Sequence, residues 1–195
     1  LKRIGLPLES LTLHVGAGTF RPLSQGDISS HVMHEERCVI SKNSLEKLAS
    51  SRRRVATGTT TLRTLESLYW MAVVHKETGN FPKVLPQWTA YNEGEVESRS
   101  TDFISYEQSI EYLLDHVAFD TKESTWDFQT QIMIRPGYRI QSIVALVTNF
   151  HQPGSTLLCL IAACLKTSWK EVYGQALFQD YRFLSYGDGC LLELE

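Results

Sequence analysis

Two segments of the chain carry the same order of features: a strand-like apolar run, a short turn rich in Gly, Ser, Thr or Pro, and a helical run. They are VATGTTTLRTLESLYWMAVV (55–74) and SIVALVTNFHQPGSTLLCLIAACL (142–165). A strand that leads through a short polar turn into a helix is the building unit of α/β sheets with parallel strands. The order therefore predicts an α/β fold, with a mixed or mostly parallel sheet flanked by helices.

The composition fits a single globular domain over residues 1–195. The chain is 43% hydrophobic and 21% charged, and its formal net charge of −3 argues against a basic surface over the whole molecule. No apolar run reaches the roughly 18 residues of a membrane span, and LKRIGLPLES (1–10) lacks an apolar signal core. The four cysteines form no C-x-x-C pair. We expect a cytoplasmic protein with reduced thiols and no membrane partner.

Periodicity and turn signals predict further elements around these two units. The predicted strands are 8–15, 35–41, 52–58, 128–134 and 142–150, and the predicted helices are 43–51, 62–78, 105–117, 155–165 and 168–178. Capping boxes predict three helix starts, at Asn43 with Glu46, Ser105 with Gln108 and Ser168 with Glu171. The segment from about 80 to 104 has little periodicity and is expected to be a long irregular connection.

Three turns follow directly after predicted strands: GAGTF (16–20), GTTTLRT (58–64) and HQPGST (151–156). In open α/β sheets, ligands bind beyond the carboxyl ends of the strands, where helix N-termini and free N–H groups converge. GTTTLRT offers hydroxyls, a helix start and Arg63 to an anion or a ribose phosphate, and it is equally well an ordinary capped turn. It lacks the G-K-[ST] of a Walker loop, and GAG alone is a weak dinucleotide signal.

Three polar segments each fit more than one interpretation. HVMHEE (31–36) holds two histidines that are typical of a strand end, of proton transfer, or of a metal site for which no third ligand is evident. The run Arg52–Arg54 is either a solvated turn or a phosphate contact. YRFLSYGDG (181–189) suits a packed aromatic corner formed by Tyr181, Phe183 and Tyr186, whereas Arg182 and Asp188 either pair with each other or contact a ligand.

Five stretches occur in one order along the chain and together resemble the S-adenosylmethionine:tRNA ribosyltransferase-isomerase family of queuosine biosynthesis. They are LHVGAGTFRPL (13–23), HVMHEE, GTTTLRTLES (58–67), TNFHQPGSTLL (148–158) and YRFLSYGDG. Members of that family are markedly longer, and their N-terminal portion includes an inserted all-β domain. The resemblance therefore implies that this chain corresponds to the C-terminal α/β part, without the all-β insert.

The resemblance implies a reaction in which the ribosyl part of S-adenosylmethionine moves to the aminomethyl-deazaguanine at the tRNA wobble position. Adenine and methionine leave, and epoxyqueuosine is formed. Such a scheme requires a base at the 5′ carbon beside the sulfonium, a proton donor for adenine, groups that hold the sugar hydroxyls, and contacts to tRNA phosphates. It requires no metal and no cofactor beyond S-adenosylmethionine as substrate.

Site residues follow from the same resemblance. His151 and Asn149 are expected at the active cleft, and His14 and His34 are rival bases. The residues expected to bind substrate are Gly16, Gly18, Thr19, Thr59, Thr60, Arg63, Glu66, Ser155, Thr156, Arg182, Tyr186 and Asp188, and those expected to bind tRNA are Arg52, Arg53 and Arg54. Glu66 is assigned to sugar hydroxyls or to the methionine amine.

The chain departs from the family pattern at several positions, and other functions stay open. Thr61 and Leu62 stand where Ser and Val are usual, Gln152 stands where Leu is common, and the connection around 90–125 is extended and acidic. One alternative is a non-catalytic tRNA-binding domain, with the fragment itself inactive. A second alternative is a metal-dependent nucleotide hydrolase that uses His31, His34 and Glu35.

Overall fold

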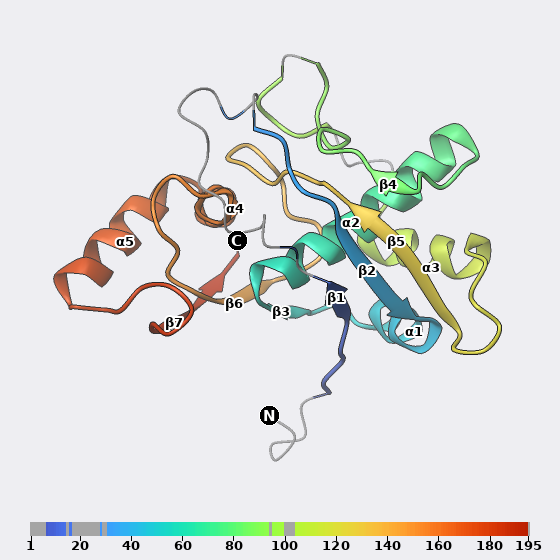
Figure 1. Cartoon of the computed structure of the whole chain (residues 1–195), viewed down its shortest axis with the longest axis horizontal. Helices are drawn as coiled ribbons and strands as arrows, with labels where there is room; N and C mark the ends of the chain where they lie inside the picture. Colours follow the sequence, from blue (N-terminus) through green and yellow to red (C-terminus); the bar gives the residue numbers. More distant parts are fainter. Residues whose placement is uncertain are drawn as a thin grey trace.

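The computed structural model describes residues 7–14, 16, 28, 31–93, 95–99 and 104–194. Within these residues the strands form two sheets, one with the order β1-β2-β5-β4 and the other with the order β3-β6-β7 (Figure 1). The bounds of the first sheet are β1 (Thr12–His14), β2 (Glu36–Ser41), β5 (Thr125–Thr130) and β4 (Val84–Leu85), and those of the second are β3 (Val55–Thr57), β6 (Ala145–Asn149) and β7 (Gly189–Glu193). Parallel pairs (β3 with β6, β4 with β5) occur beside antiparallel pairs, so the predicted mixed α/β fold is confirmed.

Helices flank both sheets. They are α1 (Lys42–Ser50), α2 (Thr59–Thr78), α3 (Tyr106–His116), α4 (Thr156–Leu165) and α5 (Trp169–Phe178), and a short 3-10 helix spans Lys166–Ser168. Figure 1 shows α4 and α5 beside the small sheet, on the opposite side of the molecule from α1 and α3. The long helix α2 contacts β3 and β6 of the small sheet and β4 of the larger one, so it joins the two halves of the core.

α2 is buried along an unbroken run from Leu62 to Val73. The sequence spacing predicts one apolar face, but here the polar face is buried as well. A buried polar group is costly unless it finds a hydrogen-bond partner. Arg63 therefore pairs with Glu36 at the start of β2, with 2.6 Å between Nη1 and Oε2, and Ser67 donates to Thr130 on β5 over 2.8 Å. These contacts hold α2 against the larger sheet.

Glu66 ties α2 to the segment that leads into β6. It has no exposed surface, and its carboxylate accepts hydrogen bonds from the backbone N–H groups of Gln141 (3.0 Å) and Ser142 (2.8 Å), from the Ser142 hydroxyl and from Tyr138 Oη. Burial raises the pKa of Glu66, and the bonds from Ser142, Tyr138 and Gln141 act in the opposite direction. Four donors converge on one carboxylate, which fixes where β6 begins.

Local signals predicted most elements, with identifiable exceptions. The capping box of Ser105 with Gln108 is confirmed, and Gly79 ends α2 in the left-handed conformation. The cap assigned to Asn43 is wrong, because Ser41 accepts the Ser44 N–H instead. Ser168 makes no side-chain cap to α5. The strand β7 was not predicted, and the described residues of 80–104 include the two-residue strand β4.

Glu66→Ala should remove the acceptor for four buried donors. We expect the free energy of unfolding to fall by about 3 kcal/mol or more, because the donors of Gln141, Ser142 and Tyr138 lose their partner. Urea denaturation followed by circular dichroism measures this loss. Glu111→Ala, on the exposed side of α3, is the matched control and should change the value by less than about 0.5 kcal/mol. Equal effects of the two substitutions would contradict the anchoring role.

Candidate active site

The strand register of the small sheet brings HQPGST next to YRFLSYGDG and sets GTTTLRT beside them. Thr57 of β3 pairs with Val147 of β6, and the Gly58 N–H donates to the Val147 carbonyl over 2.8 Å. On the other side of β6, Asn149 pairs with Gly189 of β7. HQPGST and YRFLSYGDG therefore meet at one edge of the sheet, and GTTTLRT starts one strand spacing away, about 4.8 Å.

A cavity of about 240 Å³ opens at this edge. It is lined by Asn149, His151, Gln152, Ser155, Leu157, Leu184 and Ser185. Its volume is somewhat below the roughly 300–1,000 Å³ of small-molecule sites. The described residues therefore enclose a cleft that is small for a complete substrate. It is polar on the β6 side, and Leu157 and Leu184 give it apolar walls.

His151 is held in this cavity from two directions. Its Nε2 lies 3.0 Å from Thr148 Oγ1, and its backbone N–H donates to Tyr173 Oη on α5 over 3.0 Å. Burial lowers the pKa of His151 from its ordinary value of 6.5. The ring is therefore neutral at neutral pH and can accept a proton.

The turn 181–189 is locked onto the end of β6. The Leu184 N–H donates to the Phe150 carbonyl over 2.8 Å, and a Cβ on Gly187 would lie 2.3 Å from the Arg182 carbonyl oxygen, so only glycine fits there. Asp188 accepts from the Arg182 N–H over 2.7 Å and pairs with its guanidinium over 3.2 Å. The bond from the Arg182 N–H is the main cause of the lowered pKa of Asp188. Of the two interpretations for Arg182 and Asp188, the structure thus shows the pair.

An aromatic cluster fixes the two turns relative to α5. The Phe150 ring contacts Tyr173, Tyr181 and Phe183, with centroid distances of 5.4 to 5.6 Å. The predicted aromatic corner is confirmed for Tyr181 and Phe183. It is wrong for Tyr186, which is 98% exposed next to the cavity residue Ser185. Such a ring can stack on a base or sugar that enters the cavity.

Several residues predicted to bind substrate are buried or have hydrogen-bond partners within the protein. Ser155 caps α4, since its hydroxyl accepts from the Leu158 N–H over 3.1 Å and donates to the Gln152 carbonyl over 2.8 Å. Thr156, on the first turn of α4, is buried. Arg63 and Glu66 are 4% and 0% exposed and bind within the core. The structure does not bring the charged groups of Arg63 and Glu66 to the rim.

The start of α2 lies near the cavity but does not line it. Thr59 is buried and Thr60 half-buried at this helix start, whose cap residue Gly58 provides no side chain. The positive end of the α2 dipole, with its N–H groups, therefore faces the same edge of the sheet as the cavity.

The rival histidines lie at a different edge. His14 ends β1 and pairs in register with Arg37 of β2. Since His34 precedes Arg37 by three residues, the exposed imidazoles of His14 and His34 lie at one edge of the larger sheet. Neither lines the cavity. Gly16 is exposed, and Gly18 and Thr19 lie outside the described residues. In the part of the chain that the structure describes, no three His, Cys, Asp or Glu side chains, including His31, His34 and Glu35, form a group able to hold a metal ion.

The arginine run divides into two exposed residues and one structural residue. Arg52 and Arg53 are exposed in the turn before β3. The Arg54 guanidinium instead donates to the carbonyls of Ser51 and Ser142, pairs with Glu107 over 2.8 Å and lies over the Tyr106 ring at 4.4 Å. The tRNA contact predicted for Arg54 is therefore not supported by its position.

Some residues of the site were not predicted. Leu184 and Ser185 line the cavity, and Thr148 and Tyr173 orient His151. Ser185 lies inside a motif singled out from the sequence, and Thr148 is three residues before His151. No local sequence signal indicated Tyr173, because only the tertiary position of α5 brings its hydroxyl to His151.

With a cavity beyond the carboxyl ends of parallel strands, the protein is an α/β protein with a candidate ligand site at the edge of its sheet. The chain belongs to the queuosine biosynthesis protein family, whose model matches residues 1–192. It is 36% identical over 198 residues to the S-adenosylmethionine:tRNA ribosyltransferase-isomerase of Deinococcus radiodurans, covering 99% of this chain and 41% of the relative. The protein of the same name from Xanthomonas oryzae is 34% identical, and the match covers 98% of this chain and 43% of the relative.

A solved structure agrees with these relatives. The crystal structure of S-adenosylmethionine tRNA ribosyltransferase from Thermotoga maritima matches with a TM-score of 0.56 and 27% identity, over 97% of this chain and 46% of that one. This chain therefore spans less than half the length of the proteins it matches. That share fits the expected absence of the all-β insert. Among the described residues, no helix is long and apolar enough to span a membrane.

The lowered pKa of His151 can be measured by an NMR titration of its ring signals, which are identified by their loss in His151→Asn. We expect a midpoint below 6.5, because burial disfavours the charged imidazolium. The folded protein should also lose stability relative to His151→Asn as the pH falls below about 6.5, since the unfolded state takes up the proton more readily. A midpoint at or above 6.5 would contradict the buried, neutral ring.

Proposed function

We propose that this chain is the α/β part of an S-adenosylmethionine:tRNA ribosyltransferase-isomerase that converts the aminomethyl-deazaguanine at the tRNA wobble position to epoxyqueuosine. The observation that carries the proposal is that residues of two family-like segments, HQPGST and YRFLSYGDG, line one cavity. The relatives from Deinococcus radiodurans and Xanthomonas oryzae, which are named S-adenosylmethionine:tRNA ribosyltransferase-isomerase, support it. The substrates are then tRNA and S-adenosylmethionine, with no further cofactor, and the reaction takes place in the cytoplasm.

In this proposal His151 transfers the proton. A base must remove a proton from the 5′ carbon of S-adenosylmethionine, which the neighbouring sulfonium makes acidic. The neutral, half-buried imidazole of His151 suits that role, and we assign the transfer to Nδ1 because Nε2 is engaged by Thr148. Asn149 fixes a hydroxyl or a base edge at the same rim, and Tyr186 stacks on the substrate. His14 and His34 remain rival bases.

The cavity holds only part of such a substrate pair. About 240 Å³ accommodates the ribose or the departing adenine but not a nucleotide of tRNA as well. The portion of the longer relatives that this chain does not span supplies the remaining walls in our proposal. We therefore expect the isolated chain to fold and to be weakly active or inactive.

The test uses this chain joined to the remaining portion of the family architecture. His151→Ala should lower the rate of adenine release from S-adenosylmethionine about a hundredfold, as is typical for the loss of a proton-transfer group. Chromatographic detection of adenine, with modified tRNA present, measures the rate. His116→Ala, an exposed histidine on α3, is the control. An unchanged rate in His151→Ala would remove His151 from the mechanism. tRNA binding without any adenine release would support the non-catalytic alternative, and loss of activity with a chelator would support the hydrolase.

Arg52→Ala with Arg53→Ala should lower the slope of log binding constant against log salt concentration by about two, because each arginine that contacts a phosphate releases counterions. The binding of labelled tRNA at several salt concentrations gives the slope. Arg54→Ala should instead lower the thermal stability, because it leaves Glu107 and two carbonyls without their partner. An unchanged slope in the double variant would show that this turn is merely solvated.

A further inference from the structure

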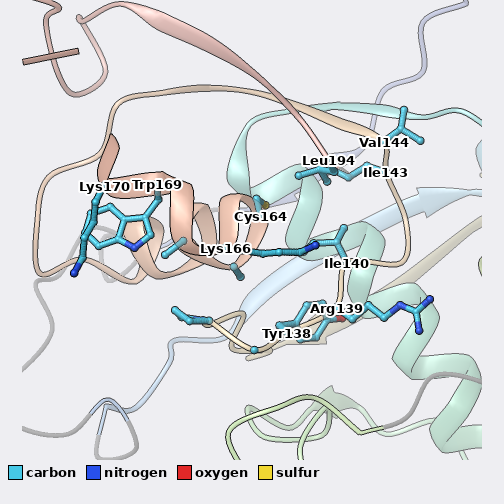
Figure 2. A pocket seen from close by; sticks show the side chains of 14 residues that line it. Tyr138, Arg139, Ile140, Ile143, Val144, Cys164, Lys166, Trp169, Lys170 and Leu194 are labelled. Carbon is cyan, nitrogen blue, oxygen red and sulfur yellow. The ribbon is translucent and has the colours of Figure 1, made fainter. Parts of the chain in front are cut away.

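A second, larger hollow lies at the other end of the small sheet. It has a volume of about 1000 Å³ and is lined by the segment 136–144, the last turn of α4, the first residues of α5 and Leu194 (Figure 2). We call it the lysine-tryptophan hollow, after Lys166, Lys170 and Trp169. Its size is at the upper end of the range for small-molecule sites. Neither the resemblance nor the candidate active site accounts for it.

The charge of this hollow is opposite to that of the whole chain. Its lining includes Arg139, Lys166 and Lys170 but no Asp or Glu, although the chain has a formal net charge of −3. Figure 2 shows the Lys166 side chain reaching across the hollow toward Ile140, whereas the Arg139 guanidinium is directed away at the margin. Two ammonium groups in a concave site with no lining carboxylate favour an anionic ligand.

The backbone of Lys166 is strained at this point. Its φ of 53° and ψ of −125° lie in a region that is sparsely populated by residues other than glycine. Strain of this kind persists where the surrounding structure enforces it, and it is concentrated at ligand sites. The strained residue lies where α4 passes directly into the 3-10 helix. The side chain of Lys166 extends into the hollow from this point.

Trp169 adds an aromatic surface beside the lysines. The indole is half-buried, its ring meets Tyr173 edge-on at 6.0 Å, and Lys170 Nζ lies 5.8 Å from its centroid. Figure 2 shows Trp169 and Lys170 side by side at one end of the hollow. An aromatic ring beside cations is the combination that binds a base by stacking and its phosphate by charge.

We propose that the lysine-tryptophan hollow binds a short stretch of an RNA chain, with a base against Trp169, one phosphate at Lys170 and another at Lys166. The hollow contains Ile143 and Val144, which precede β6, whereas the active-site cavity follows β6. Five strand residues separate the two by about 17 Å. A ligand that occupies both sites must span that distance. A polymer can do so, whereas a mononucleotide is too short. The identity of the RNA as tRNA rests on the proposed function.

The test compares two lysine pairs in the binding of fluorescently labelled tRNA. Lys166→Gln with Lys170→Gln should weaken binding about tenfold and lower the salt slope by about two. Lys83→Gln with Lys122→Gln removes the same charge at exposed positions elsewhere and should leave the slope unchanged. Trp169→Leu should weaken binding about tenfold through lost stacking, with folding checked by circular dichroism.

Each result decides the proposal. An unchanged slope in Lys166→Gln with Lys170→Gln, or an equal loss in the control pair, overturns it. AMP binding that Trp169→Leu abolishes, together with tRNA binding that Trp169→Leu leaves unchanged, would identify a mononucleotide site instead and also overturns the proposal. Adenine release by the longer protein is measured in parallel. Absence of release, together with weaker binding in the hollow variants, would refute the proposed function and leave the RNA site standing.

Discussion

The burial of α2 on all sides is the constraint on which the rest of the structure depends. A helix enclosed in this way must satisfy each polar side chain inside the core, because water is excluded there. Arg63 pairs through Nη1 with Glu36 of the larger sheet, although its Nη2 is buried without a hydrogen-bond partner, and Glu66 accepts from Ser142 before the central strand of the smaller sheet. Both sheets are thus attached to one helix by charged groups, which are far more sensitive to position than apolar contacts are.

This attachment sets the geometry of the candidate active site. α2 begins one strand spacing from β6, and Glu66 fixes the segment that leads into β6. The carboxyl end of β6 therefore lies beside the start of α2, and the turn 181–189 closes the other side through the Phe150 carbonyl. His151 lies on a frame whose position is determined by backbone hydrogen bonds and ring packing. A proton-transfer group needs such a fixed position to be effective.

The two hollows at opposite ends of β6 give the small sheet two distinct surfaces. The smaller one presents an imidazole and an amide, whereas the larger one presents lysines and an indole. In our proposals the first acts on the reacting nucleotide and the second binds a distant part of the same RNA. The chain spans 41% and 43% of two longer relatives, so in our proposals the portion it does not include supplies further contacts to the RNA.

The sequence by itself determined the α/β class, the strand–turn–helix units and the family, because these depend on local periodicity, turn chemistry and ordered motifs. It also predicted that Asn149 and His151 lie at the end of a strand. Only the tertiary structure decided that Arg63, Glu66 and Arg54 bind within the protein, that Tyr186 is exposed, and that Tyr173 supports His151. The physical reason is that burial and partner choice depend on which elements pack around a side chain, and residues far apart in the sequence supply those partners.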